Sequence, residues 1–231
     1  MAELQNVILT STYFGPVQWY QKLNRAENIL IEQHDNYCKQ TYRNRCLIAG
    51  ANGVEALTIP VERPSGTPLH HTAMKDMRIS DHGNWRHVHW NALVAAYSDS
   101  AFFEYYADDI RQFYEKRWDY LLDYNEAIYI KMCNLLDVDL NGKRIMRTEQ
   151  YGTATGKTMA DGITLCSPQG GGASDDFADF REVIDPKHPL PDSTFCPIPY
   201  YQVFAHKHGF IPNLSILDLL FNMGPEAILY L

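Results

Sequence analysis

Three cationic side chains come just before a predicted β-hairpin and could together bind an anion. Lys39, Arg43 and Arg45 lie within one short polar run, and Arg43 and Arg45 are two residues apart. Side chains two apart share a face of a β-strand, so both guanidinium groups would point the same way. Guanidinium groups bind carboxylates and phosphates through paired hydrogen bonds. We therefore expect Lys39, Arg43, Asn44 and Arg45 to bind substrate; the alternative is that the arginines only pair with acidic side chains on the surface.

A tight turn at Asn52-Gly53 predicts the hairpin that would hold these cations. The pair separates two runs rich in strand-forming residues, 46–49 and 56–61. Asn-Gly is the strongest short signal for a hairpin, because both positions of its turn favour positive φ. The hairpin is therefore expected to be a rigid base with the cations at its edge.

The start of the chain suggests a second place for a ligand. Residues 6–14 predict a strand, and their continuous apolar start is typical of a strand covered on both faces. A helix over about 17–26 and a strand over 28–33 are expected to follow. The turn at 10–15 would then lie where open α/β sheets bind ligands and where free N–H groups attract anions. Tyr13 in this turn is a candidate substrate-binding residue, and its alternative role is that of a core aromatic.

His89 is the candidate general base. Trp85, His87 and His89 alternate along the sequence. An imidazole can accept the proton of a hydroxyl or an amine near neutral pH. Two histidines two residues apart could also hold a metal, but no third ligand of fixed spacing is visible, so we predict no metal site.

The remaining pattern predicts a mixed α/β fold. The strand-helix-strand unit and the β-hairpin would open a mixed sheet that helices cover. Further helices are expected from about Trp90, over 101–116, over 125–136 and after Ser215, and short strands over 74–80, 143–151 and 200–205. The stretch 152–176 is rich in Gly, Ser, Thr and Asp, so we expect a long mobile loop there, within a single domain of residues 1–231.

Several polar residues stand where they could cap these helices. Asp99 and Ser100 precede the helix expected at 101–116, and Asp123 or Asn125 could cap the next one. The spacing of Ser215 and Asp218 fits a capping pair. For Asp218, we favour this structural role over a catalytic one.

Composition excludes some classes of protein. The net charge is −8, which argues against non-specific binding to nucleic acid. No apolar run is long enough to span a membrane, and we expect no signal peptide. The 5 cysteines are widely spread and show no zinc-binding spacing. They indicate a reduced, cytoplasmic protein.

Four stretches of the chain, 11–23, 39–61, 85–106 and 213–231, together resemble the WbqC-like protein family. The run Lys-x-x-Tyr-Arg-Asn-Arg at 39–45 and the run Asn-Leu-Ser-Ile-Leu-Asp-Leu-Leu at 213–220 are the most specific parts. The resemblance implies a bacterial cytoplasmic protein that takes part in O-antigen or other surface-polysaccharide assembly. It assigns no catalytic residue. The turn at 11–16 departs from the Pro-Tyr-Phe-Pro sequence of some members.

Two functions remain open at this point. The first, suggested by the resemblance, is a transferase that passes an aminoacyl or glycyl group to an amino sugar. The cations would bind a small sugar or nucleotide-sugar ligand, and His89 would act as base. The second is a non-catalytic sugar-binding or scaffold protein of the same pathway, which would associate with other polysaccharide-biosynthesis enzymes. Neither function identifies a cofactor.

Overall fold

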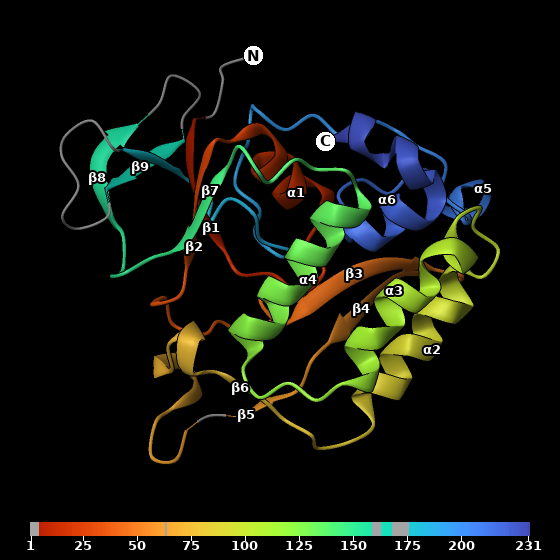
Figure 1. Cartoon of the computed structure of the whole chain (residues 1–231), viewed down its shortest axis with the longest axis horizontal. Coiled ribbons are helices and arrows are strands. Elements are labelled where there is room, and N and C mark those ends of the chain that lie inside the picture. The colour runs from red at the N-terminus through yellow and green to blue at the C-terminus, as the bar shows by residue number, and fades with distance from the viewer. Residues whose placement is uncertain (1–4, 63, 159–162, 168–175) are drawn as a thin grey trace.

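A six-stranded mixed sheet forms one end of the molecule, as Figure 1 shows. The structure is a computed structural model and describes residues 5–62, 64–158, 163–167 and 176–231. The strand order is β7-β2-β1-β10-β9-β8. Strands β7, β2, β1 and β10 run parallel, and β9 and β8 continue the sheet in antiparallel fashion. Their bounds are Asn6–Thr10 (β1), Asn28–Glu32 (β2), Arg144–Arg147 (β7), Thr153–Thr158 (β8), Thr164–Ser167 (β9) and Phe177–Asp179 (β10). The predicted mixed α/β class is confirmed.

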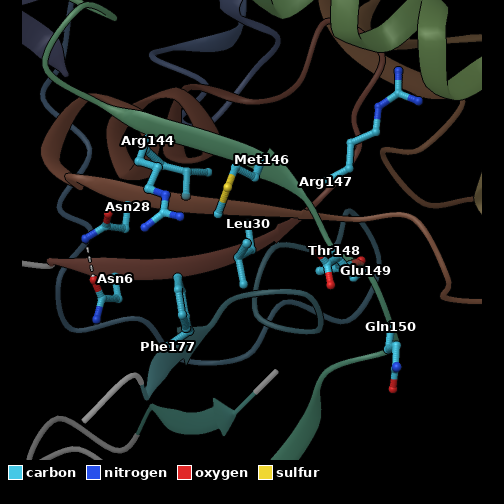
Figure 2. A pocket seen from close by; sticks show the side chains of 11 residues that line it. Asn6, Asn28, Leu30, Arg144, Met146, Arg147, Thr148, Glu149, Gln150 and Phe177 are labelled. Carbon is cyan, nitrogen blue, oxygen red and sulfur yellow. Dashed lines mark hydrogen bonds between the residues drawn. The ribbon is translucent and has the colours of Figure 1, made fainter. Parts of the chain in front are cut away.

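The two faces of this sheet differ. Val7 and Ile29 point into the main core, which α1 (Val17–Arg25) and α4 (Leu121–Leu135) share. Ile8, Leu30 and Phe177 belong to a small separate cluster on the opposite face. Figure 2 shows that second face, where Leu30 of β2 lies near Met146 of β7 and Phe177 projects from β10. The strand-helix-strand unit β1-α1-β2 therefore forms as predicted, with the alternation of its side chains dividing them between two clusters.

The predicted β-hairpin forms a separate two-stranded sheet. Strands β3 (Arg45–Gly50) and β4 (Gly53–Thr58) pair in antiparallel fashion. Gly50 is opposite Gly53, so the turn falls on Ala51 and Asn52, one residue earlier than expected. Among residues 50–53, only Gly53 has a positive φ, +111°. The glycine is thus needed where the turn enters β4 rather than inside the turn.

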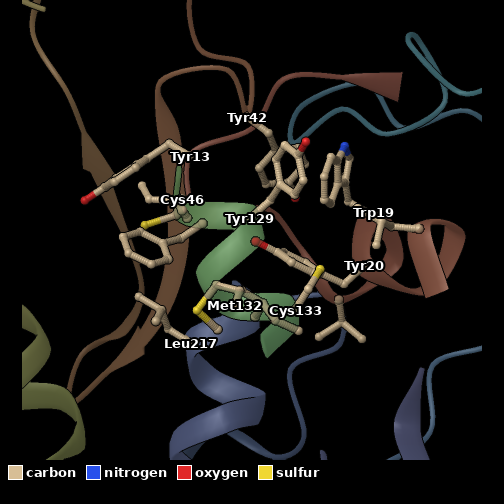
Figure 3. Packing of buried hydrophobic residues seen from close by; sticks show 14 of the residues in the cluster. Tyr13, Trp19, Tyr20, Tyr42, Cys46, Tyr129, Met132, Cys133 and Leu217 are labelled. Atoms are coloured by element: carbon tan, nitrogen blue, oxygen red, sulfur yellow. The ribbon is translucent and has the colours of Figure 1, made fainter. Parts of the chain in front are cut away.

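Helices pack around the hairpin. They are α2 (Trp85–Tyr97), α3 (Phe103–Glu115), α4, α5 (Ala205–His208) and α6 (Ile216–Met223). Short 3₁₀ helices span Leu69–His71, Met74–Asp76 and Gly224–Tyr230, and the two-residue strands β5 (Val61–Glu62) and β6 (Arg78–Ile79) pair with each other. Figure 3 shows the shared core, in which Tyr13, Tyr20 and Met132 pack between α1, α4, α6 and the hairpin. Within the described ranges, no helix combines the length and apolar character that a bilayer crossing requires.

Several local predictions are wrong. Helix α4 begins at Leu121, so Asp123 and Asn125 lie inside it and cap nothing. Ser100 donates its hydroxyl hydrogen bond back to the Tyr97 carbonyl at the end of α2 instead of capping α3. Residues 200–205 form no strand but lead into α5.

The stretch 152–176 is also not simply a loop. Strands β8 and β9 lie within it and extend the sheet. They were not predicted, because this stretch has few apolar residues. The rest of the predicted loop, 159–162 and 168–175, lies outside the described residues.

A buried carboxylate fastens the C-terminal part of the chain to α2. Asp218 is 0% exposed, and it accepts hydrogen bonds from the hydroxyls of Tyr97 (2.9 Å) and Tyr200 (2.7 Å) and from the Gln202 amide (2.9 Å). Burial raises the pKa of Asp218, while these three donors act to lower it. The Ser215 hydroxyl caps α6 by accepting from the Leu217 N–H, as predicted, but Asp218 serves the core and not the cap.

Replacing the buried tyrosine tests this fastening. We expect Tyr200→Phe to lower the free energy of unfolding by about 1–3 kcal/mol, because the Asp218 carboxylate, which is 0% exposed, loses a hydrogen bond. Urea unfolding followed by fluorescence measures the change. Tyr201→Phe is the control, since that neighbouring side chain is 61% exposed. Equal effects of the two variants would contradict the role given to Asp218.

Candidate functional site

The turn after β1 is not open to a ligand. Residues 10–15 are all buried. The Tyr13 N–H donates to the Tyr42 carbonyl (2.9 Å). At the start of α1, the Val17 N–H donates to the Leu214 carbonyl (3.0 Å) and the Gln18 N–H to the Asn213 side chain (2.9 Å). The prediction of an anion site at the start of α1 is therefore wrong, because the first two N–H groups of the helix already donate to the C-terminal part of the chain.

The predicted cation cluster does not assemble as one group. Lys39 is exposed. Arg45 begins β3, and its Nε donates to the Thr58 hydroxyl across the hairpin (3.0 Å). The buried Asn44 amide donates to the Ile59 carbonyl (2.7 Å). Arg43 precedes the strand and pairs with Asp35. Of these four predicted binding residues, Arg43 is the one that lines the cavity described next.

A cavity of about 630 Å³ lies at the carboxyl ends of the parallel strands. We call it the carboxyl-edge cavity. Asp35 follows β2, Tyr151 and Gly152 follow β7, and Asp179 ends β10. Its other lining residues are Arg43, Ile163, Thr164, Arg181, Glu182, Val183, Leu190 and Pro191. Open α/β sheets commonly bind ligands at this edge. The cavity lies at the edge of the sheet where a ligand site was predicted, but beyond β2 and β10 instead of at the turn after β1.

A buried ion-pair network forms the floor of this edge. Glu32, at the end of β2, is 0% exposed and accepts from Arg181 (2.9 Å), from the Thr148 hydroxyl (2.8 Å) and from the Gly152 N–H (3.3 Å). Arg181 also donates to both carboxylate oxygens of Asp179 (3.0 and 2.6 Å). Burial acts to lower the pKa of Arg181, but the hydrogen bonds and charge of Asp179 raise it overall. Arg181 is thus a fixed cation whose main task is to join strand ends.

Asp35 differs from the other carboxylates because one of its oxygens is unused. Its Oδ2 accepts from Arg43 Nε (3.0 Å) and from Arg43 Nη2. Its buried Oδ1 has no hydrogen-bond partner in the part of the chain that the structure describes. Burial raises the pKa of Asp35 even though the Arg43 charge opposes this. A carboxylate held at one oxygen and unsatisfied at the other is suited to accept a proton or a ligand N–H.

The Asp35–Arg43 pair is positioned from both sides. The Asp35 carbonyl accepts from the Met74 N–H (2.9 Å). The buried Asn125 amide on α4 donates to the Arg43 carbonyl (2.8 Å) and to the Ser11 hydroxyl (2.8 Å). Asn125 thereby ties Arg43 to the turn after β1. This role was missed in the sequence, where Asn125 was interpreted as a helix cap.

His89 and Tyr13 do meet, but in the core. The Tyr13 hydroxyl lies 3.0 Å from His89 Nδ1 and 2.8 Å from the Tyr114 hydroxyl. His89 is 4% exposed, and the Trp85 ring packs against it with 5.2 Å between ring centroids. Burial lowers the pKa of His89 to about 4. Neither residue lines the carboxyl-edge cavity. The imidazole is neutral at pH 7 and serves here as a hydrogen-bonding part of the aromatic core.

Other residues of the cavity could not be found from the sequence. Asp35, Asp179 and Arg181 belong to no recognisable motif. Strand β10, which ends at Asp179, has only 3 residues and pairs with the distant β1, with Ala178 opposite Val7. The available signal was the charged pair Asp179 and Arg181 on either side of Phe180, a pattern that is common on protein surfaces.

The buried imidazole predicts a pH dependence of stability. Because the folded-state pKa of His89 lies near 4, below its ordinary value of 6.5, the unfolded chain takes up the proton first as the pH falls. The free energy of unfolding therefore decreases as the pH falls from 6.5 toward 4. Between pH 7 and pH 5 the decrease is about 2 kcal/mol. Urea unfolding at both pH values measures it. His89→Gln should be less stable at pH 7 and lose less on acidification.

His87→Gln is the matched control, because His87 is an exposed histidine on the same helix. It should keep the wild-type loss of stability between pH 7 and pH 5. If His89→Gln and His87→Gln followed the same pH profile, the assignment of this titration to the buried imidazole would be wrong.

Comparison with known proteins places the chain in a family. It is 26% identical over 231 residues to "Uncharacterized protein Rv1507c" of Mycobacterium tuberculosis, an alignment that covers 97% of this chain and 96% of that protein. No solved structure matches the chain. The WbqC-like protein family matches residues 11–230, so the segments of the carboxyl-edge cavity, from Asp35 to Pro191, lie within the matched region. The chain belongs to the WbqC-like protein family.

Proposed function

We propose that this protein is a transferase of bacterial surface-polysaccharide (O-antigen) biosynthesis, which passes an aminoacyl or glycyl group to an amino sugar. The amino sugar binds in the carboxyl-edge cavity. The observation that carries the proposal is the unused oxygen of Asp35, in a carboxylate that lines this cavity and that Arg43 holds in place. The family resemblance supports the pathway.

The lining of the cavity suits a polar ligand that has both an amine and hydroxyls. Asp35 and the exposed Glu182 supply negative charge for an ammonium group, while Arg43 supplies positive charge for an anionic substituent. The Tyr151 ring is 48% exposed, and the Arg181 guanidinium lies over it, 4.7 Å from the ring centroid. Aromatic rings of this kind present an apolar face to a sugar and a polar edge to water. A monosaccharide fits within about 630 Å³.

Asp35 acts as the general base of the proposed reaction. The amine nitrogen of the sugar attacks the acyl carbon of an activated aminoacyl donor. A C–N bond forms, the bond from the acyl carbon to the leaving group breaks, and the leaving group takes that electron pair. Asp35 accepts the proton that the nitrogen loses. Because burial raises its pKa, Asp35 is a stronger base than an exposed aspartate.

Binding measurements test the acceptor half of the proposal. We expect glucosamine 1-phosphate to bind more tightly than glucose 1-phosphate, by about tenfold, since the amine makes a charge-assisted hydrogen bond that a hydroxyl does not. Asp35→Asn should remove this preference, because the amide lacks the negative charge. Asp99→Asn, an exposed aspartate outside the cavity, is the control. Isothermal titration calorimetry measures all the affinities.

A transfer assay separates an enzyme from a binding protein. With a glycyl thioester as donor, mass spectrometry should detect N-glycylated sugar, and Asp35→Asn should lower the rate at least about 100-fold. Urea unfolding of the variant checks that it still folds. Sugar binding without transfer would favour the non-catalytic sugar-binding or scaffold alternative. Absence of binding by both sugars would overturn the proposal.

A further inference from the structure

A second cavity lies on the open face of the sheet (Figure 2). We call it the sheet-face cavity; its volume is about 330 Å³. Leu30 and Phe177, with Met146 of β7, give it an apolar floor. Arg144 and Asn28 stand at one end, and the segment 148–150 stands at the other. The cavity therefore combines apolar side chains on its floor with polar groups at its rim.

The alternation of β7 directs two arginines to different tasks. Arg147 points toward α4, where it pairs with Asp123 (2.6 Å) and with Glu126. Arg144 and Met146 point to the opposite face and line the cavity, and Met146 is 41% exposed. Parallel strands are usually covered on both faces. Among the described residues, this part of the sheet instead leaves an apolar side chain open beside a cation.

The polar groups of the rim have unused hydrogen-bonding capacity. Arg144 makes no ion pair or side-chain hydrogen bond within the described ranges, whereas Arg147 makes two ion pairs. The Asn28 side-chain amide donates to Asn6 Oδ1 (2.8 Å), which leaves the Asn28 side-chain oxygen available as an acceptor. Gln150 is exposed at the other end. The cavity thus offers a cation, an acceptor and an amide around an apolar floor.

We propose that the sheet-face cavity binds a nucleoside monophosphate group, free or as part of a larger nucleotide. The planar base lies on Leu30, Met146 and Phe177, which bury its apolar face. The phosphate pairs with the Arg144 guanidinium. The edges of the base meet the side-chain amides of Asn28 and Gln150. An acyl chain would leave these amides unmatched, and a sugar alone would not cover the apolar floor. This site does not depend on the function proposed for the carboxyl-edge cavity.

Calorimetric titration with AMP and UMP tests the proposal. At least one of the two should bind, and adenosine or uridine and inorganic phosphate should each bind at least about tenfold more weakly, because each keeps only one of the two contacts. Titration with UDP-glucose tests whether the cavity binds a free nucleotide or the nucleotide part of a sugar donor. Arg144→Gln should weaken the nucleotide about tenfold and leave the nucleoside unchanged. Met146→Asp should weaken both.

Two variants keep the test specific. Lys39→Gln removes an exposed cation outside the cavity and should bind nucleotide like the wild type. Asp99→Asn should do the same, because Asp99 is exposed and lies outside both cavities. The proposal is overturned if neither nucleotide binds, if inorganic phosphate binds as tightly as the nucleotide, or if Arg144→Gln binds nucleotide with wild-type affinity.

Discussion

The carboxylate of Glu32 is the contact on which the sheet edge depends. It accepts hydrogen bonds from groups that follow three different strands: the His34 N–H after β2 (2.8 Å), the Thr148 hydroxyl after β7 and the Arg181 guanidinium after β10. A buried carboxylate is costly unless donors surround it, and removing one partner of a buried ion pair typically costs about 3–5 kcal/mol. The three strand ends must therefore meet in one arrangement for Glu32 to be satisfied.

This constraint explains why the carboxyl-edge cavity contains both fixed and unused charges. The Arg181 guanidinium forms ion pairs with both Asp179 and Glu32, so these three side chains form a rigid wall. Asp35 stands a few residues beyond Glu32 and shares none of the hydrogen bonds of that wall. It keeps one unused oxygen because Arg43 approaches it from one side only. The segment 185–199 closes the far wall, where Asp192 pairs with the buried Lys22 of α1 (2.7 Å) next to Leu190 and Pro191.

Local patterns were enough to predict the β1-α1-β2 unit, the hairpin and the amphipathic helices, because each depends on side chains close in sequence. The sheet order was not predictable, since β10 reaches β1 from a distant part of the chain and is only 3 residues long. For the site, the sequence drew attention to Arg43, which lines the carboxyl-edge cavity, but grouped it with Arg45, whose hydrogen bond to Thr58 belongs to the hairpin. His89 was chosen for its chemistry alone, and its burial in the aromatic core, away from the cavity, could not be seen in the sequence. The three hydrogen-bond partners of Asp218 were equally hidden, because they come from two distant segments, α2 and residues 200–202.

The segment from Thr148 to Gly152 has one further consequence. Thr148 and Gln150 border the sheet-face cavity, while Tyr151 and Gly152 border the carboxyl-edge cavity. A Cβ atom at residue 152 would stand 2.7 Å from Cys166 Sγ, so the backbone there has little room to adapt. A ligand that binds in one cavity and shifts this short connection would change the shape of the other cavity. Thermodynamic linkage then requires that the two occupancies influence each other equally in both directions.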